Sequence, residues 1–334
     1  MTPKLFRHPK NPILTPTKNS WENKWVFNCG AAIHNGKVVL LYRAQGNDDI
    51  SRFGLAVLED GVRVQERSKN HVMGPDSDTE YESHGVEDPR ITQIGETYYI
   101  LYTAASLYPP LVPRPEEGRL PGDIPWRVRV SLAHTADFQK FVRHGVIISH
   151  IDSKDATLFP EQINKNYVLL HRVYPQMRLA VAPTLHEFHE RGVKERGVYI
   201  WPREGKWDSE RVGAGAPPIK TPYGWLLFYH GVNHDLVYRL GILLADLVDP
   251  SKILIRTDES ILEPQKTYER KGQTPNVVFT CGAVEWHNHF LVYYGAADSV
   301  IGMAYIEKEN LFRWIEGKLK EKRPSRSLSA IPER

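Results

Sequence analysis

A repeated pattern of strand, turn and strand runs through almost the whole chain and limits its fold more than any other feature. Five such stretches end at Arg43, Thr103, Arg172, His230 and Gly295, so their ends lie about 60 to 70 residues apart. Each contains a central turn, such as Asn-Gly in "FNCGAAIHNGKVVLLYR", followed by a more apolar run. This pattern predicts five β-hairpins.

A further segment follows each hairpin and alternates polar with apolar residues, as in "RFGLAVLED" and "RVSLAHTADF". Such alternation is typical of a half-buried strand. A hairpin with a third and a fourth strand makes a small sheet that cannot bury both of its faces alone. We therefore predict that five sheets stack around an axis as a single all-β domain over residues 1–334, a five-bladed β-propeller whose first strands line a central channel. An open solenoid is the alternative, but it requires polar caps at its ends, which the sequence lacks.

Helical patterns are scarce. The candidates are "LHEFHERGVKE" (residues 185–195) and "EKENLFRWIEGKLKEK" (residues 307–322), and the second predicts a short C-terminal helix that closes the fold. The basic residues after it, from about 320 to 334, predict a disordered tail.

Composition excludes several classes of function. The net charge of +3 is too small to favour nucleic acid, and the absence of a long apolar segment argues against a membrane. Two cysteines in 334 residues cannot form a disulfide framework, so a cytoplasmic location is the expectation. The sequence has no zinc-binding, dinucleotide, P-loop or serine-hydrolase motif, which predicts that no metal or organic cofactor is needed.

Polar residues recur at matching positions of the repeats. Fifteen residues before the hairpin ends lie Asn28, Asp88, Thr157, Gly215 and Thr280, and Asp298 follows the last hairpin. Taken singly, Asp88 of "GVEDPRI" could simply open a turn, and Arg43, Arg172 or His230 could be a buried structural residue. Burying several such groups together without a ligand is unfavourable. The set therefore predicts a polar pocket on the axis.

The most specific segments, "FNCG", "GVEDPR", "RVGAGAPPI", "LLFYHGV", "TPNVVF" and "YYGAAD", resemble those of glycoside hydrolase family 130. This family contains β-mannoside phosphorylases and related mannosidases, which are five-bladed propellers. The resemblance extends over roughly residues 8–315.

The resemblance implies a role for each matching residue. Asp88 would be the general acid, passing its proton through the 3-hydroxyl of the bound mannose. The mannose would be held by Asn28, Arg43 and Asp298. The phosphate would be bound by Lys154, Arg172, Arg211, His230 and Tyr238. In two of these places the chain departs from the phosphorylase pattern, because Lys154 replaces an arginine and Arg211 replaces a lysine. Cys29 also stands where the family often has serine.

The resulting hypothesis is inverting phosphorolysis of a β-1,4- or β-1,2-mannoside to α-mannose 1-phosphate and a shortened sugar. Inorganic phosphate would be the co-substrate. An inverting mannosidase that uses water is the alternative within the family, and Glu161, Glu210 or Asp235 would then supply its base. A non-catalytic carbohydrate-binding propeller is the alternative from another class.

A proline-rich insertion, "LYPPLVPRPEEGRLPGDIPW" (residues 107–126), separates the second hairpin from its next strand. Long loops in compact domains are usually functional or disordered. We expect this one to shape the acceptor side of the pocket, with Tyr108 or Trp126 stacking on a sugar. It would do so in its own subunit or in a neighbour, since a homo-oligomer is compatible with the sequence. An idle surface loop is the alternative.

Overall fold

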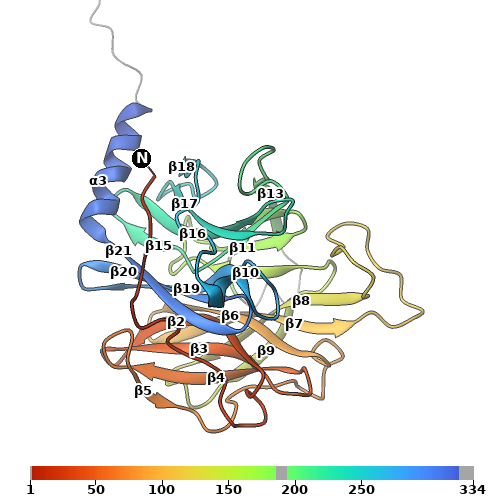
Figure 1. Ribbon diagram of the computed structural model, residues 1–334. Helices are drawn as coiled ribbons and strands as arrows, with labels where there is room; N and C mark the ends of the chain where they lie inside the picture. Colours follow the sequence, from red (N-terminus) through yellow and green to blue (C-terminus); the bar gives the residue numbers. More distant parts are fainter. Residues whose placement is uncertain (1, 186–193, 323–334) are drawn as a thin grey trace, which may run out of the picture.

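The computed structural model describes residues 2–185 and 194–322, and almost all of its regular structure is β-strand (Figure 1). Its strands form five antiparallel groups in chain order. The first contains β2 (Trp25–His34), β3 (Lys37–Gln45), β4 (Ser51–Leu58) and β5 (Val64–Arg67). The second contains β6 (Gly85–Ile94), β7 (Thr97–Leu107), β8 (Trp126–Thr135) and β9 (Val142–Ile148).

The third group contains β10 (Lys154–Leu158), β11 (Tyr167–Val173), β12 (Gln176–Ala182) and β13 (Lys194–Ile200). The fourth contains β14 (Arg211–Ala214), β15 (Ile219–Thr221), β16 (Gly224–Val232), β17 (Tyr238–Ala245) and β18 (Ile253–Arg256). The last contains β19 (Val278–Trp286), β20 (His289–Ala296), β21 (Val300–Glu307) and the N-terminal β1 (Phe6–Arg7). One parallel bridge, between Ser51 and Gly85, joins the first two groups into an eight-stranded sheet.

The five hairpins and the strand after each of them are confirmed. The fourth hairpin differs in detail, because its first strand is divided into β14 and β15. Pro217 and Pro218 lie between the two parts. Proline has no N–H to donate to a sheet, so the pairing with β16 is interrupted there.

Apolar side chains fill the spaces between consecutive groups. Four clusters lie between the first and second, second and third, third and fourth, and fourth and fifth groups. A fifth cluster, which includes Val26, Tyr42, Tyr293 and Met303, lies between the last group and the first. Because both faces of each group are covered, the sequences of its inner strands are nearly continuous apolar runs. In β16, for example, every residue is buried.

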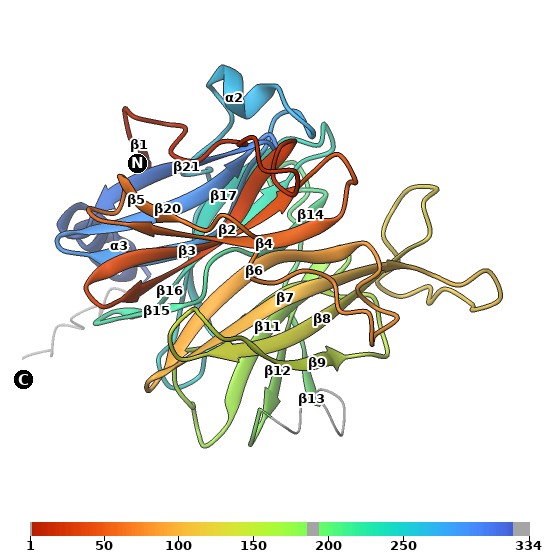
Figure 2. The same cartoon turned by 90° about the horizontal axis from the view of Figure 1, so that it is seen from below.

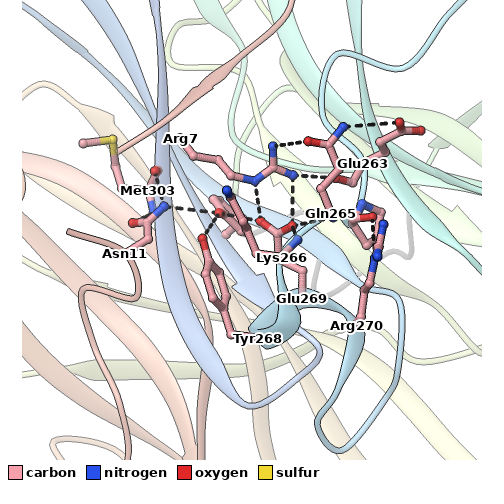
Figure 3. Close-up of polar contacts among 11 residues, drawn as sticks. Arg7, Asn11, Glu263, Gln265, Lys266, Tyr268, Glu269, Arg270 and Met303 are labelled. Atoms are coloured by element: carbon pink, nitrogen blue, oxygen red, sulfur yellow. Dashed lines mark hydrogen bonds and ion pairs between the residues drawn. The ribbon is translucent and has the colours of Figure 1, made fainter. Parts of the chain in front are cut away.

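The N-terminal segment is held against the last strand group and the segment around Glu269 (Figure 3). β1 pairs with β21, and the Arg7 guanidinium donates to both carboxylate oxygens of Glu269, at 2.7 and 2.9 Å. Glu269 lies in the short helix α2 (Thr267–Arg270) and is fully buried. Its carboxylate also accepts from the Tyr294 hydroxyl and from the backbone N–H groups of Gln265 and Lys266. The pair thus fixes the start of the chain and α2 to the last group.

Removing the Arg7 guanidinium should destabilise the protein. In Arg7→Ala the buried Glu269 carboxylate keeps its neutral donors but loses its cation, and a hydrogen bond to a charged group contributes about 1.5 to 3 kcal/mol. We expect a lower denaturant midpoint and a melting temperature lower by a few degrees. Arg313→Ala is the control, because it breaks only solvent-exposed contacts, an ion pair with Glu309 and a hydrogen bond to Asn310. Equal losses in the two variants would show that the buried pair adds nothing.

The predicted C-terminal helix is confirmed as α3 (Lys308–Glu321), which buries Leu311 and Ile315 on one face against the fourth and fifth groups. Lys320 and Glu321, placed in the predicted tail, belong to this helix, and residues 323–334 lie outside the described residues. The other helix candidate is wrong where it can be compared, because Lys194 and Glu195 begin β13. Residues 186–193 also lie outside the described part. No helix in the described ranges is long and apolar enough to cross a membrane.

Candidate active site

The first strand of each of the first three groups carries a β-bulge near its beginning, and each of these three bulges holds a polar residue in the left-handed region. These residues are Asn28 (φ 42°), Asp88 (φ 53°) and Asp155 (φ 54°), and the strand registers shift there. Asn and Asp tolerate this conformation better than most residues, and a bulge redirects the side chain beside it. The same unfavourable backbone geometry in three consecutive groups indicates a functional site.

The third position corrects the sequence analysis, which matched Thr157, and not Asp155, to Asn28 and Asp88. Thr157 lies fifteen residues before the hairpin end at Arg172, as Asn28 and Asp88 lie before theirs. However, β2 and β3 are joined by Asn35 and Gly36 alone, whereas residues 159–166 join β10 and β11, so equal spacing from the hairpin end does not identify equivalent positions. Thr280 was matched to the same position in the last repeat. Its hydroxyl donates to the backbone carbonyl groups of Gly282 and Tyr293.

A cavity of about 100 Å³ lies beside these bulges and gathers most of the predicted site residues. Its lining residues are Asn28, Arg43, Asp88, Lys154, Arg172, Tyr238, Val277, Phe279 and Asp298. Seven of the nine predicted residues are therefore brought together from strand groups far apart in the sequence.

Asp88 is held in one orientation inside this cavity. Its carboxylate accepts from Asn28 Nδ2 at 2.9 Å and from Arg43 Nη1 at 3.2 Å. Burial opposes ionisation of Asp88, but the charges of Arg43, Lys154 and Arg90 outweigh it and hold its pKa below the ordinary value. The free protein therefore carries Asp88 as a carboxylate at neutral pH.

Asp298 is a second carboxyl group of the cavity and behaves differently. Burial raises its pKa to about 6, although a hydrogen bond from Thr274 and the charge of Arg43 oppose the shift. The nearby negative charge of Asp88 acts in the same direction as burial. The pKa values of the two carboxyl groups are thus shifted in opposite directions although the groups share one cavity.

Cationic side chains from the third and fourth groups form one side of the cavity. Lys154 and Arg172 are cross-strand partners on β10 and β11. Arg211 donates to the Tyr238 hydroxyl at 2.6 Å, and its guanidinium carbon lies 5.1 Å from the centre of that ring. Arg211 is therefore placed next to the cavity through Tyr238.

His230 is the predicted phosphate ligand that the structure places elsewhere. It is fully buried, does not line the cavity, and has Nε2 at 3.4 Å from Asp155 Oδ2. Its ring centre lies 4.4 Å from that of Phe279, which does line the cavity. Burial lowers the pKa of His230 to about 4, so the imidazole is neutral at pH 7.

Sequence reasoning missed several residues around the cavity. Glu87 pairs with Arg43 at 2.6 Å and approaches Lys154 at 3.9 Å, and its position beside Asp88 in "GVEDPR" was the available signal. Asp155 follows Lys154 directly, but nothing in the sequence indicates the bulge that turns it inward. Phe279 and Val277 read as ordinary apolar strand residues.

The bases proposed for a hydrolase lie outside the cavity. Glu161 pairs with Lys220 at 2.6 Å, and Glu210 accepts from His234 at 2.9 Å. Asp235 is exposed and accepts from Asn233. None of the three lines the cavity.

The proline-rich insertion extends from the body between β7 and β8 (Figure 2). Tyr108 is not available to stack on a sugar, which corrects one expectation. It is buried, donates to Asp152 at 3.0 Å and accepts from Arg129 at 3.0 Å. Trp126 packs edge-on against His84. Gly118 forms a bridge with Tyr174, so the insertion lies against the β11–β12 turn. A role in acceptor selection stays a prediction.

The chain is similar to known proteins over nearly its whole length. The sequence pattern of glycoside hydrolase family 130, described as β-1,4-mannooligosaccharide phosphorylase, matches residues 4–111 and 122–317. The chain is 40% identical over 316 residues to a 1,2-β-oligomannan phosphorylase of Thermoanaerobacter sp. (strain X514), covering 92% of this chain and 99% of the relative. It is 38% identical over 323 residues to a β-1,2-mannobiose phosphorylase of the same organism, with the same coverage.

A solved structure shares the architecture. The β-1,2-mannobiose phosphorylase of Listeria innocua, in complex with β-1,2-mannobiose, superposes with a TM-score of 0.79 at 28% identity. The superposition covers 94% of this chain and 99% of that structure. Residues 112–121 of the insertion fall outside the family match.

Proposed function

Because the chain belongs to glycoside hydrolase family 130, we propose that it cleaves a β-1,2-linked mannoside with inorganic phosphate, yielding α-mannose 1-phosphate and a shortened sugar. The relatives that are 38 and 40% identical are β-mannoside phosphorylases, and the chain is a β-mannoside phosphorylase by this evidence. The linkage, the inverted configuration and the residue roles are the proposed part.

The observation that carries the proposal is the arrangement of charge in the cavity. Asp88 lies among lining residues that include Lys154 and Arg172, while Tyr238 brings in Arg211. An inverting hydrolase needs a carboxylate base for its water, but a phosphorylase needs one acid and a site for an anion that is already nucleophilic. Arginine suits this anion because its planar guanidinium donates two parallel hydrogen bonds.

In this proposal Asp88 is the general acid and Asn28, Arg43 and Asp298 hold the mannose. The proton would pass from Asp88 through the mannose 3-hydroxyl to the leaving oxygen. The negative charge of phosphate offsets the cations that keep the pKa of Asp88 low, so phosphate binding favours the protonated acid. Phosphate would thereby supply both the nucleophile and the conditions for protonation.

The second carboxyl group, Asp298, is the feature that a hydrolase could use as a base. The cationic side of the cavity favours a sugar-binding role for Asp298 instead, because that side has no evident purpose without an anionic co-substrate. A non-catalytic binding protein is disfavoured by the family's phosphorylase relatives.

The β-1,2 linkage is proposed from the relatives. Those that are 38 and 40% identical act on β-1,2-linked mannosides by name, and the Listeria enzyme was solved with β-1,2-mannobiose. The family description names β-1,4-mannooligosaccharides. Sequence alone left both linkages open.

We further propose that the five strand groups are the blades of one propeller domain. The five apolar clusters support this, since each lies between consecutive groups and one lies between the last group and the first. A cytoplasmic location is proposed on the two cysteines, Cys29 and Cys281, which are both free and buried. No metal or organic cofactor enters the proposed reaction, and a homo-oligomer stays a prediction.

Asp298 makes mannoside binding sensitive to pH. Its pKa of about 6 lies above the ordinary value, so between about pH 4 and 6 the folded protein holds a proton that an exposed aspartate would have lost. An ionised carboxylate accepts hydrogen bonds from sugar hydroxyls, and the acid form accepts them less well. Binding of β-1,2-mannobiose without phosphate, measured by calorimetry, should weaken as the pH falls through 6.

Asp298→Asn should bind mannobiose more weakly at pH 7 and lose the change near pH 6. Arg43, Asp88 and Lys154 also face Asp298, so the variant is needed to assign the transition. A transition that persists in Asp298→Asn would belong to another group.

The proposed reaction is tested by incubating the protein with β-1,2-mannobiose with and without inorganic phosphate. Sugar release that requires phosphate supports the proposal. Equal release in both samples would make the protein a hydrolase, and no release in either, with binding retained, would make it a binding protein. β-1,4-Mannobiose, assayed in parallel, tests the linkage.

A further inference from the structure

Asp155 is a buried carboxylate at the meeting point of three other polar side chains. Its Oδ2 lies 2.9 Å from Arg172 Nη1 and 3.4 Å from His230 Nε2, and Arg90 Nη2 donates to its Oδ1 at 3.3 Å. It is completely buried and does not line the cavity. Although burial opposes ionisation, Arg172, His230 and Arg90 hold its pKa well below the ordinary value.

Arg90 is a fixed partner on one side of Asp155. Its guanidinium also donates to the backbone carbonyl of Asp88 at 3.0 Å and to those of Ala214 and Gly215 at 2.9 and 2.8 Å. With 1% exposure, it has no solvent into which to reorient. Arg90 therefore connects Asp155 to the backbone of the proposed acid.

Arg172 is a less constrained partner on the other side. It lines the cavity, and its Nε is buried with no hydrogen-bond partner. Among the described residues its one ion pair is with Asp155. The orientation of the Arg172 guanidinium in the cavity thus depends on this carboxylate.

A direct contact between Asp155 and phosphate is unfavourable, since both are negatively charged. We infer that Asp155 is a positioning residue of the phosphate site, which aims Arg172 at the anion and links it through Arg90 to the backbone of Asp88. The inference rests on the proposed function. The inference also gives His230 a role that acts through Asp155. The His230 ring does not line the cavity, but its Nε2 can donate to Asp155 Oδ2.

Asp155→Asn tests the inference by keeping the shape of the side chain while removing its charge. A weakened charged contact to Arg172 should raise the KM for phosphate by about tenfold, while the KM for mannobiose stays within about twofold. Asp208→Asn is the matched control. Asp208 is equally buried and contacts two arginines, Arg203 and Arg256, at 3.0 and 2.6 Å, but it lies away from the cavity. It should lower stability without a selective change in the KM for phosphate.

A double-mutant cycle separates positioning from a general structural role. In an Arg172→Ala background, Asp155→Asn should not raise the KM for phosphate further, because the side chain it positions is gone. The same relative increase in both backgrounds would overturn the inference, as would an unchanged KM in the single variant.

His230→Gln provides a second route if Asp155→Asn does not fold. It should raise the KM for phosphate less than Asp155→Asn is expected to, and only when Arg172 is present. An increase that persists without Arg172 would mean that His230 acts on phosphate independently, which overturns the positioning role. A wild-type protein that does not respond to inorganic phosphate would overturn the proposed function together with this inference, whereas a wild-type response with an unaffected variant overturns the inference alone.

Discussion

Asp88→Asn should fold normally and lose nearly all turnover, in the direction of cleavage and in that of synthesis. General acid catalysis contributes about 10² to 10⁴ in rate, and an amide cannot donate a proton to the leaving oxygen. Asn28 and Arg43, which now hold the carboxylate, can still orient the amide oxygen. The measurement is kcat with β-1,2-mannobiose and saturating phosphate.

Asp152→Asn is the matched control for this variant. Asp152 is buried in the same way and pairs with Arg129 at 2.5 Å, but it does not line the cavity. Its amide variant should retain kcat even if its melting temperature falls. Wild-type turnover in Asp88→Asn would remove Asp88 from the mechanism and leave "GVEDPR" as a turn.

The second large effect is expected at the cationic side of the cavity. Arg172→Ala and Arg211→Ala should each raise the KM for phosphate far more than the KM for mannobiose. Loss of a charged hydrogen-bond partner corresponds to about 1.5 to 3 kcal/mol, which is about a 10- to 150-fold change. Initial rates over a matrix of phosphate and mannobiose concentrations give both constants.

Lys220→Ala controls for a general loss of positive charge, because Lys220 pairs with Glu161 on the surface away from the cavity. It should leave both constants unchanged. If Arg172→Ala and Arg211→Ala raise both constants by the same factor, these residues organise the cavity without contacting the anion.

The sequence predicted most of the fold because the repeat is local. Turn residues such as Asn35-Gly36 and alternating strands are visible in short windows, and the five hairpins they predict are present. Single positions were harder. Thr157 was predicted at the position that Asp155 occupies, because the loop within the hairpin differs in length between the repeats. The residue types around a β-bulge also do not distinguish it from an ordinary strand.

The site was predicted as a set more reliably than as individual roles. Family resemblance placed Asp88, Lys154 and Arg172 around one cavity, and the structure brings them together. Family resemblance could not indicate that His230 is buried beside Asp155 and does not line the cavity. The burial of His230 depends on how the third and fourth groups pack against each other. Glu87 and Asp155 were missed for a related reason, since their importance comes from the ion pairs that the fold creates.

In the proposed reaction phosphate, not water, attacks the sugar and inverts its configuration. Proton and phosphorus NMR of the products formed from β-1,2-mannobiose in phosphate buffer test this most directly, when spectra are recorded early in the reaction. We expect α-mannose 1-phosphate and free mannose in equal amounts from the first time point, one from each half of the substrate. Two free mannose molecules per cleavage with no phosphate ester, or a β-mannose 1-phosphate product, would contradict it.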